Sequence, residues 1–208
     1  MAVQSLVIEA STAVHQIGVL EGDRFATFFS STEGTLMGFF SILSQFSSDF
    51  HYDEIIFCEG PGQMLGIRSA IMFTRIAKII HPHIRTYTYN NLVLVDRIRN
   101  RLLLPIEGLL CVRKGQTQHY IFEDDHIFPI NNETLWCRTN PIYRLATHHH
   151  EMPDRALPIT YDLRNHGDIL RTVITPNEAI ETTYDSQNEY KKWTPPHFIS
   201  SAKNSKKD

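Results

Sequence analysis

Short apolar runs separated by polar turns open the chain and predict three β-strands, at residues 5–9, 14–20 and 24–29. The polar turn Glu21-Gly22-Asp23 between the second and third runs is typical of a β-hairpin. We therefore expect the chain to begin with three strands that pair antiparallel in chain order.

From residue 33 the apolar positions change to helical spacing. A helix is predicted at 33–46, with an apolar face made of Leu36, Phe39, Phe40, Leu43 and Phe46. It is followed by a strand at 53–58, a helix at 64–80, a strand at 84–88 and a helix at 90–100 that begins at an asparagine cap. Three antiparallel strands followed by strand–helix crossovers indicate a mixed sheet flanked by helices, as in an RNase H-like lobe.

The same order of elements starts again in the second half of the chain. Strands are predicted at 107–113, 117–123 and 126–130, which repeats the strand–turn–strand–turn–strand plan of the first residues. The predicted fold class is therefore α/β, with two RNase H-like lobes, each a mixed sheet flanked by helices, and a second lobe that is small.

The lobes set the expected domain boundaries. The first lobe is placed at residues 1–102, the second at 103–190, and a basic flexible tail at 191–208. Within the second lobe we expect a strand at 157–163 and a short helix at 167–173.

Composition excludes several classes of protein. The 208 residues carry a formal net charge of −3 and are 42% hydrophobic, which is typical of a globular protein and not of one that coats nucleic acid. No apolar run reaches the roughly 18 to 20 residues of a membrane span, and the start lacks the pattern of a signal peptide. Cys58, Cys111 and Cys137 are too widely spaced for a CxxC metal site, and a cytoplasmic location is expected.

A glycine-rich string stands between the predicted strand at 53–58 and the predicted helix at 64–80. It reads Gly60-Pro61-Gly62-Gln63-Met64-Leu65-Gly66-Ile67-Arg68. Its first two glycines permit a positive φ or a close backbone approach, and the proline stiffens the turn between them. Gly66 removes a side chain where the helix would press against a neighbouring backbone.

This string and the end of the first strand resemble the motifs of the TsaB (YeaZ) family. The family's first strand reads like Ile-Asp-Thr-Ser, where this chain has Ile8-Glu9-Ala10-Ser11, and its signature is Gly-Pro-Gly-Ser-Phe-Thr-Gly-x-Arg. The glycines, the proline and Arg68 match, whereas the Ser-Phe-Thr centre of the signature does not. The resemblance covers residues 5–123 and implies the actin-like (ASKHA) fold of two RNase H-like lobes.

The resemblance implies a non-catalytic scaffold in the formation of N6-threonylcarbamoyladenosine on tRNA. In the family, two helices of the first lobe contact the larger catalytic homologue TsaD, or a second copy when TsaD is absent, and TsaE supplies an ATPase. The implied partners are therefore a TsaD-like protein, a TsaE-like ATPase or a second copy of the chain, with tRNA contacted only indirectly. No resident cofactor is implied, and ATP or ADP would bind only weakly or at a partner interface.

The helices predicted at 33–46 and 64–80 carry more apolar residues than one buried face requires. This excess favours a helix-on-helix docking surface, and the alternative is that the second lobe covers both helices. The residues expected at the partner interface are Leu36, Phe39, Phe40, Leu43, Ile67, Arg68, Ile71, Met72 and Arg75.

Two enzymatic alternatives stay open. A diverged actin-like ATPase or phosphotransferase would use Glu9 and Ser11 toward Mg²⁺ and nucleotide, although the turn that follows Glu9 offers no glycine for close phosphate approach and the chain has no GxxxxGK[ST] loop. In the structural interpretation, Glu9 instead caps its turn. An M22 glycopeptidase-like homologue would need a metal, but no two histidines have HxxxH spacing, and His148-His149-His150 is expected to be a polar loop. No metal site is predicted.

Overall fold

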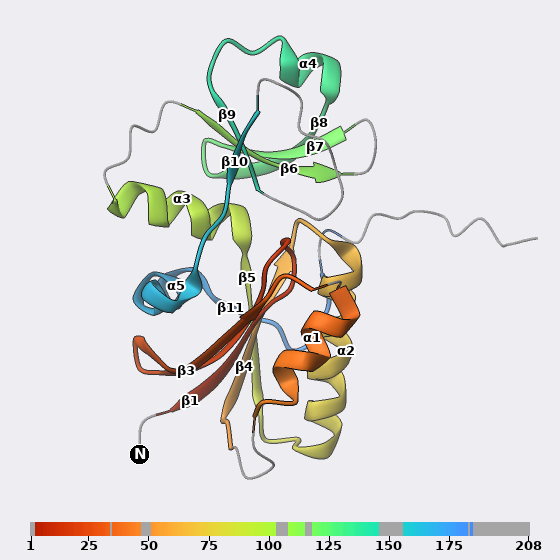
Figure 1. The fold of residues 1–208 in the computed structure, drawn as a ribbon, viewed down its shortest axis with the longest axis vertical. Helices are drawn as coiled ribbons and strands as arrows, with labels where there is room; N and C mark the ends of the chain where they lie inside the picture. The colour runs from red at the N-terminus through yellow and green to blue at the C-terminus, as the bar shows by residue number, and fades with distance from the viewer. Residues whose placement is uncertain are drawn as a thin grey trace, which may run out of the picture.

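The computed structural model describes residues 3–33, 35–46, 51–102, 108–114, 118–145, 156–182 and 184. These residues form two lobes, each built on one β-sheet (Figure 1). The first sheet has the spatial order β11-β5-β4-β1-β2-β3 and consists of β1 (Gln4–Glu9), β2 (His15–Glu21), β3 (Arg24–Ser31), β4 (Glu54–Gly60), β5 (Arg85–Asn90) and β11 (Thr175–Pro176). As predicted, β1, β2 and β3 pair antiparallel, while β4 joins β1 in parallel.

Helices cover both faces of the first sheet. The helices α1 (Thr35–Leu43) and α2 (Met64–Ile80) lie on one face, and α3 (Asn91–Arg101) and α5 (Gly167–Val173) lie on the other (Figure 1). The central strands are therefore buried on both sides: Leu6 and Ile8 of β1 point to the α1–α2 side, and Val7 points to the α3–α5 side. Continuous apolar runs such as Ile55–Cys58 are the sequence pattern of such doubly covered strands.

The second lobe repeats the strand order of the first. Its sheet has the order β10-β9-β6-β7-β8 and consists of β6 (Leu109–Lys114), β7 (Gln118–Glu123), β8 (His126–Asn131), β9 (Ile142–Leu145) and β10 (Ala156–Ile159), with the short helix α4 (Asn132–Trp136) beside it. In both sheets the first strand lies between an antiparallel neighbour that follows it and a parallel strand that comes later. The predicted fold class, with two related mixed sheets flanked by helices, is confirmed.

Helix α3 joins the two lobes. It begins at Asn90, whose side-chain oxygen accepts hydrogen bonds from the amides of Leu92 and Val93, as the predicted asparagine cap required. Leu94 and Ile98 pack into the first lobe. Leu92 packs into the core of the second lobe, so α3 contributes to both.

The end of the described chain returns to the first lobe, which corrects the expected boundary of the second lobe at 103–190. The 3₁₀ helix η1 (Leu163–Asn165) and α5 bury Leu163 and Leu170 against the first sheet, and β11 pairs with the edge of β5. The strand expected at 157–163 ends at Ile159, because the chain leaves the second sheet there. The predicted helix at 167–173 is confirmed as α5.

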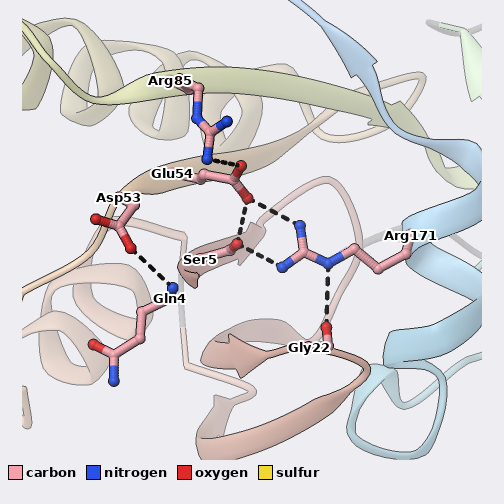
Figure 2. Close-up of polar contacts among 7 residues, drawn as sticks. All are labelled: Gln4, Ser5, Gly22, Asp53, Glu54, Arg85 and Arg171. Carbon is pink, nitrogen blue, oxygen red and sulfur yellow. Dashed lines mark hydrogen bonds and ion pairs between the residues drawn. The ribbon is translucent and has the colours of Figure 1, made fainter. Parts of the chain in front are cut away.

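An ion-pair cluster around the buried Glu54 fixes α5 to the beginning of the central strands. Figure 2 shows Arg171 of α5 reaching the start of β1 and β4, where its guanidinium donates to Ser5 Oγ (2.7 Å) and Glu54 Oε2 (2.9 Å). The other carboxylate oxygen of Glu54 pairs with Arg85 at 2.8 Å. Because Glu54 is buried with both oxygens paired, this cluster is a structural clamp.

Several predictions concern segments that lie partly or wholly outside the described residues. The helix predicted at 33–46 is described as α1 over the shorter range Thr35–Leu43. The triple histidine at 148–150 and the tail at 191–208 lie outside the described residues.

Among the residues that are described, no helix has the length and apolar character needed to cross a membrane, and no group of three or more metal-ligating side chains comes together.

Candidate functional site

The glycines of the motif bring α2 into direct contact with the turn after β1. A Cβ atom at Gly66 would lie 1.8 Å from the carbonyl oxygen of Ala10, and one at Gly62 would lie 2.2 Å from that of Ser11. The amide of Gln63 donates to the same Ser11 carbonyl at 2.7 Å. The predicted close backbone approach is therefore confirmed, and it leaves no space for a ligand between the motif and this turn.

Glu9 lies at the end of β1 in a buried cluster that we call the Glu9 hub. The hub consists of Glu9, Ser11, Cys58, Tyr89, Asn91 and Tyr161. The Ser11 amide and hydroxyl both donate to Glu9 Oε1 at 2.6 Å, and the hydroxyl of Tyr89 donates to Oε2 at 2.7 Å. The hydroxyl of Tyr161 donates to Oε2 as well. All four donors are part of the chain itself, so both carboxylate oxygens are engaged internally.

Ser11 extends the hub toward α3 and β4. Its hydroxyl oxygen accepts from Asn91 Nδ2 at 2.7 Å and from the Cys58 thiol at 3.3 Å. Asn91 Nδ2 also donates to the carbonyl of Pro61 at 2.7 Å, which ties the motif loop to the start of α3. The hub therefore links β1, β4, the motif loop and α3 in one hydrogen-bonded unit.

Burial controls the protonation of the hub. Burial, followed by the nearby negative charge of Glu9, raises the pKa of Tyr89 and of Tyr161 well above the usual value of a tyrosine. The same two causes, in the same order, raise the pKa of the Cys58 thiol. All three groups remain neutral donors near pH 7, and Cys58 has none of the thiolate character that a nucleophile needs.

The hub includes two predicted site residues, Glu9 and Ser11, but not in an arrangement that suits a nucleotide. Mg²⁺ is bound through water and oxygen ligands that face an open site, whereas Glu9 is buried and its oxygens accept four hydrogen bonds. The residues present therefore do not fit a nucleotide–magnesium group at this position. The turn-capping interpretation of Glu9 agrees with its bonds to Ser11.

The second candidate site is an apolar groove between α1 and α2, which we call the α1–α2 groove. It has a volume of about 350 Å³ and is lined by Leu36, Phe39, Phe40, Leu65, Arg68, Ser69, Met72, Phe73 and Ile76. The two helices lie side by side on the outer face of the first lobe (Figure 1). Among the described residues, eight of the twelve large apolar side chains that are exposed belong to these two helices. Five of these eight line the groove, and an exposed apolar patch of this kind is typical of a protein docking surface.

The structure divides the predicted interface residues into three groups. Leu36, Phe40, Arg68 and Met72 line the groove with exposed side chains, and Arg75 is exposed on the same helix. Phe39 forms the buried floor of the groove, and Leu43 is half-buried against the core.

Two of the predicted interface residues do not reach the surface. Ile67 and Ile71 lie on the face of α2 that packs on the sheet, with 0% and 7% of their surface exposed, which corrects their assignment to the interface. A partner cannot contact them without opening the core of the first lobe.

Sequence reasoning missed several residues of both sites. In the groove these are Leu65, Ser69, Phe73 and Ile76. Leu65 and Ile76 recur at helical spacing with the predicted Met72, which is the signal that would have revealed them. In the hub the missed residues are Tyr89, Asn91 and Tyr161. Tyr161 is 152 positions from Glu9, and nothing in the local sequence indicates that the two meet.

Two lobes that repeat the same strand order and are joined by a helix define the class of two-lobed α/β proteins. Two solved structures from Pseudomonas aeruginosa share the fold: YeaZ, with a TM-score of 0.51 and 14% identity, and an uncharacterized protein with similarity to peptidase YeaZ, with a TM-score of 0.52 and 12% identity. Each match covers 81% of this chain and 89% of the solved chain. The chain therefore has the YeaZ (TsaB) fold, as the motifs predicted. No family model and no curated protein matches the chain.

Proposed function

We propose that this chain is a non-catalytic docking subunit that binds a TsaD-like catalytic homologue through the α1–α2 groove. In this role it supports the formation of N6-threonylcarbamoyladenosine on tRNA and contacts tRNA only through its partner. A TsaE-like ATPase is a further proposed member of the assembly, and ATP or ADP binds only weakly or at a partner interface.

The observation that carries the proposal is the exposed apolar surface of α1 and α2. The groove side chains Leu36, Phe40, Leu65, Met72 and Ile76 are 46%, 59%, 55%, 57% and 51% exposed, although a surface helix normally keeps such side chains on its core face. At about 25 cal/mol for each Å² of apolar surface removed from water, covering this patch provides a strong driving force for association. The second lobe, which was the alternative cover, packs on α3.

The Glu9 hub supports a binding role over an ATPase or a glycopeptidase. A catalytic carboxylate or magnesium ligand must present an oxygen to substrate, and both oxygens of Glu9 are engaged with the chain's own donors. Calorimetry with Mg-ATP on the isolated chain tests this point. We expect no heat of binding, and stoichiometric binding in the micromolar range would favour the ATPase alternative.

Co-purification with the TsaD-like protein of the same organism tests the docking role. The variants Phe40→Glu and Met72→Glu place a charge in the groove, so we expect them to lose the partner while they keep the melting temperature of the parent chain. The matched control is Leu157→Glu on β10, because Leu157 is also exposed (53%) but lies in the second lobe. We expect this control to co-purify normally.

The biochemical consequence is measured in cells that lack the chain. Total tRNA from these cells is expected to lose N6-threonylcarbamoyladenosine, and the parent chain, but not Met72→Glu, is expected to restore it. If Met72→Glu restores the modification fully, the groove is not needed for the proposed function.

A further inference from the structure

Two connections between the lobes are held by the Glu9 hub. The first is α3, where Asn91 Nδ2 donates to Ser11 Oγ at 2.7 Å. The second is the segment between β10 and η1, where the hydroxyl of Tyr161 donates to Glu9 and the carbonyl of Tyr161 accepts from Gln16 Nε2 at 2.9 Å. Because both connections are fixed at the same buried cluster, the hub is the point about which one lobe would turn relative to the other.

A third contact between the lobes is made by Tyr184, at the end of the described chain. Its hydroxyl accepts a hydrogen bond from Asn90 Nδ2 at 2.8 Å, and its ring meets the ring of Tyr120 edge to face, with the centroids 5.3 Å apart. The ring also lies beside Gly60 of the motif loop, 3.7 Å from the place that a Cβ atom would take there. Asn90 and Gly60 belong to the first lobe and Tyr120 to the second, so the side chain of Tyr184 bridges the lobes.

The segment that carries Tyr184 is anchored in the first lobe. The amide of Asn177 donates to the carbonyl of Thr86 at 3.0 Å, and the hydroxyl of Thr86 donates to the carbonyl of Asn177 at 2.7 Å. Asn177 Nδ2 also donates to the carbonyl of Glu181 at 2.8 Å, which closes a turn. Within this turn Ile180 has a φ of 53°, a rare value for a β-branched residue, and its side chain is buried in the core beneath α2. Such a strained turn persists because these contacts hold it in place.

The end of this segment is held by weaker contacts than its beginning. The hydroxyl of Thr182 donates to the carbonyl of Glu59 at 2.5 Å, which directs the chain toward the second lobe. Tyr184 itself is half-buried, so water reaches it and can replace Asn90 as the partner of its hydroxyl at a small net cost. The beginning of the segment therefore stays in place when Tyr184 leaves.

From this arrangement we infer that Asn177–Thr182 and Tyr184 form a latch between the lobes. With Tyr184 in place the second lobe is held closed against the first, and when Tyr184 leaves, the second lobe turns about the Glu9 hub as one body. The α1–α2 groove is lined by residues of α1 and α2 only, so its shape does not change in this motion. The latch is a property of the isolated chain and does not depend on the docking function proposed above.

Two spin labels, one on each lobe, measure the closure directly. Cys137, which follows α4 in the second lobe, is exposed, whereas Cys58 and Cys111 are buried, so a thiol-specific label reacts with Cys137 in the folded chain. The second label is attached to Ala26→Cys, at an exposed position of β3 in the first lobe. Double electron–electron resonance on the full chain then gives the distribution of distances between the lobes.

We expect the parent chain to show one main distance, with an open population below about 10%. Tyr184→Ala removes both the hydrogen bond to Asn90 and the ring contact with Tyr120, so we expect the ratio of open to closed chains to rise about tenfold. Tyr184→Phe loses only the hydrogen bond and is expected to raise this ratio about threefold.

Substitutions of Tyr120 test the latch from the other lobe. Tyr120→Ala removes the ring contact and is expected to open the chain in the same direction as Tyr184→Ala. Tyr120→Phe is the matched control, because it keeps the ring that Tyr184 meets, and we expect it to leave the distances unchanged.

A free phenol provides a test that does not depend on how a variant folds. Added to Tyr184→Ala, 4-methylphenol supplies the missing side chain and is expected to restore the closed distance. Toluene lacks the oxygen that accepts from Asn90, so we expect it to restore the closed distance less well. Equal restoration by the two compounds, or none by either, overturns the inference.

Hydrogen exchange distinguishes an opened latch from a locally unfolded α3. The amides of Leu92 and Val93 are capped by Asn90 and should stay protected in Tyr184→Ala, because the latch can open without loss of this cap. Rapid exchange of both amides would mean that the start of α3 has unfolded, and the inference is then wrong. An unchanged distance distribution in Tyr184→Ala, or opening in Tyr120→Phe, also overturns it.

Discussion

The Glu9 hub and the α1–α2 groove lie on opposite sides of α2 and differ in how far the chain satisfies them. In the hub, each oxygen of the Glu9 carboxylate accepts two hydrogen bonds. Gly62 and Gly66 of the motif let the backbone pack directly against the adjoining turn at Ala10 and Ser11. In the groove, large apolar side chains face solvent, and the described residues provide nothing to cover them. The polar site that resembles an active site is complete without a ligand, and the apolar surface is the one that requires a partner.

The difference predicts opposite consequences of substitution. A change in the hub acts on folding, because it removes a partner from a buried polar group or forces two backbones apart. A change in the groove acts on binding and leaves the fold intact. The predictions below follow the expected size of the effect on the free energy of unfolding.

The largest effect is expected for Gly66→Ala. Alanine normally stabilises a helix relative to glycine by about 1 kcal/mol, but here the new Cβ would lie 1.8 Å from the Ala10 carbonyl. We expect urea denaturation to show a free energy of unfolding that is lower by about 3 kcal/mol or more, because the backbone must move to make room for the new atom. Ser69→Ala, one turn later on the same helix and facing the groove, is the control and is expected to change stability by less than about 0.5 kcal/mol. If Gly66→Ala is as stable as the parent chain, the close packing of α2 against the turn after β1 is wrong.

The next effect is expected when the hub loses one hydrogen-bond donor. Tyr161→Phe and Tyr89→Phe each keep the ring but remove a hydroxyl that donates to Glu9 Oε2, so we expect each to cost about 1.5 to 3 kcal/mol. Because the two hydroxyls share one acceptor atom, the double variant should deviate from the sum of the single variants by at least about 0.5 kcal/mol. Strict additivity in the double-mutant cycle would mean that the two tyrosines act separately.

The hub also predicts how stability depends on alkaline pH. Burial raises the pKa of Tyr89 and Tyr161 well above the usual tyrosine value, so the folded chain keeps protons that the unfolded chain releases above pH 10. The stability that the folded chain gains from these raised pKa values is complete below pH 10, and it is lost as the pH rises toward the pKa of the folded state. Each tyrosine is expected to lower the free energy of unfolding by about 1.4 kcal/mol per pH unit in that range. Denaturation curves between pH 9 and 11.5 test this, and Tyr161→Phe should reduce the slope by the equivalent of one proton.

Much of the first lobe follows from local sequence patterns. The short apolar runs give the strands β1 to β5 within two residues, and the helical spacing of apolar positions predicts α2 at its observed bounds, Met64–Ile80. The repeated strand plan gives the two-lobed fold, because the same pairing rules apply to both halves. The glycine motif gives the close contact of α2 with the turn after β1, because only glycine permits such a contact.

Long-range contacts could not be predicted in this way. The return of the chain to the first lobe depends on Tyr161, Arg171 and the two-residue strand β11, and none of these has a local pattern of its own. For α2, an apolar arc this wide does not show which part of it faces the sheet. Ile71 (7% exposed) and Met72 (57% exposed) are neighbours in sequence, and only the position of the helix on the sheet assigns one to the core and the other to the groove.

The smallest effect on stability is expected for Met72 itself. Its side chain is exposed, so Met72→Ser removes few internal contacts, and we expect the free energy of unfolding to change by less than about 0.5 kcal/mol. The same substitution removes apolar surface from the groove and should weaken binding of the TsaD-like protein by at least about tenfold, as measured by titration calorimetry. A loss of stability comparable to that of Tyr161→Phe would mean that the groove is already covered by the chain itself. In that case the contrast between a satisfied hub and an unsatisfied groove, and with it the docking function, would be lost.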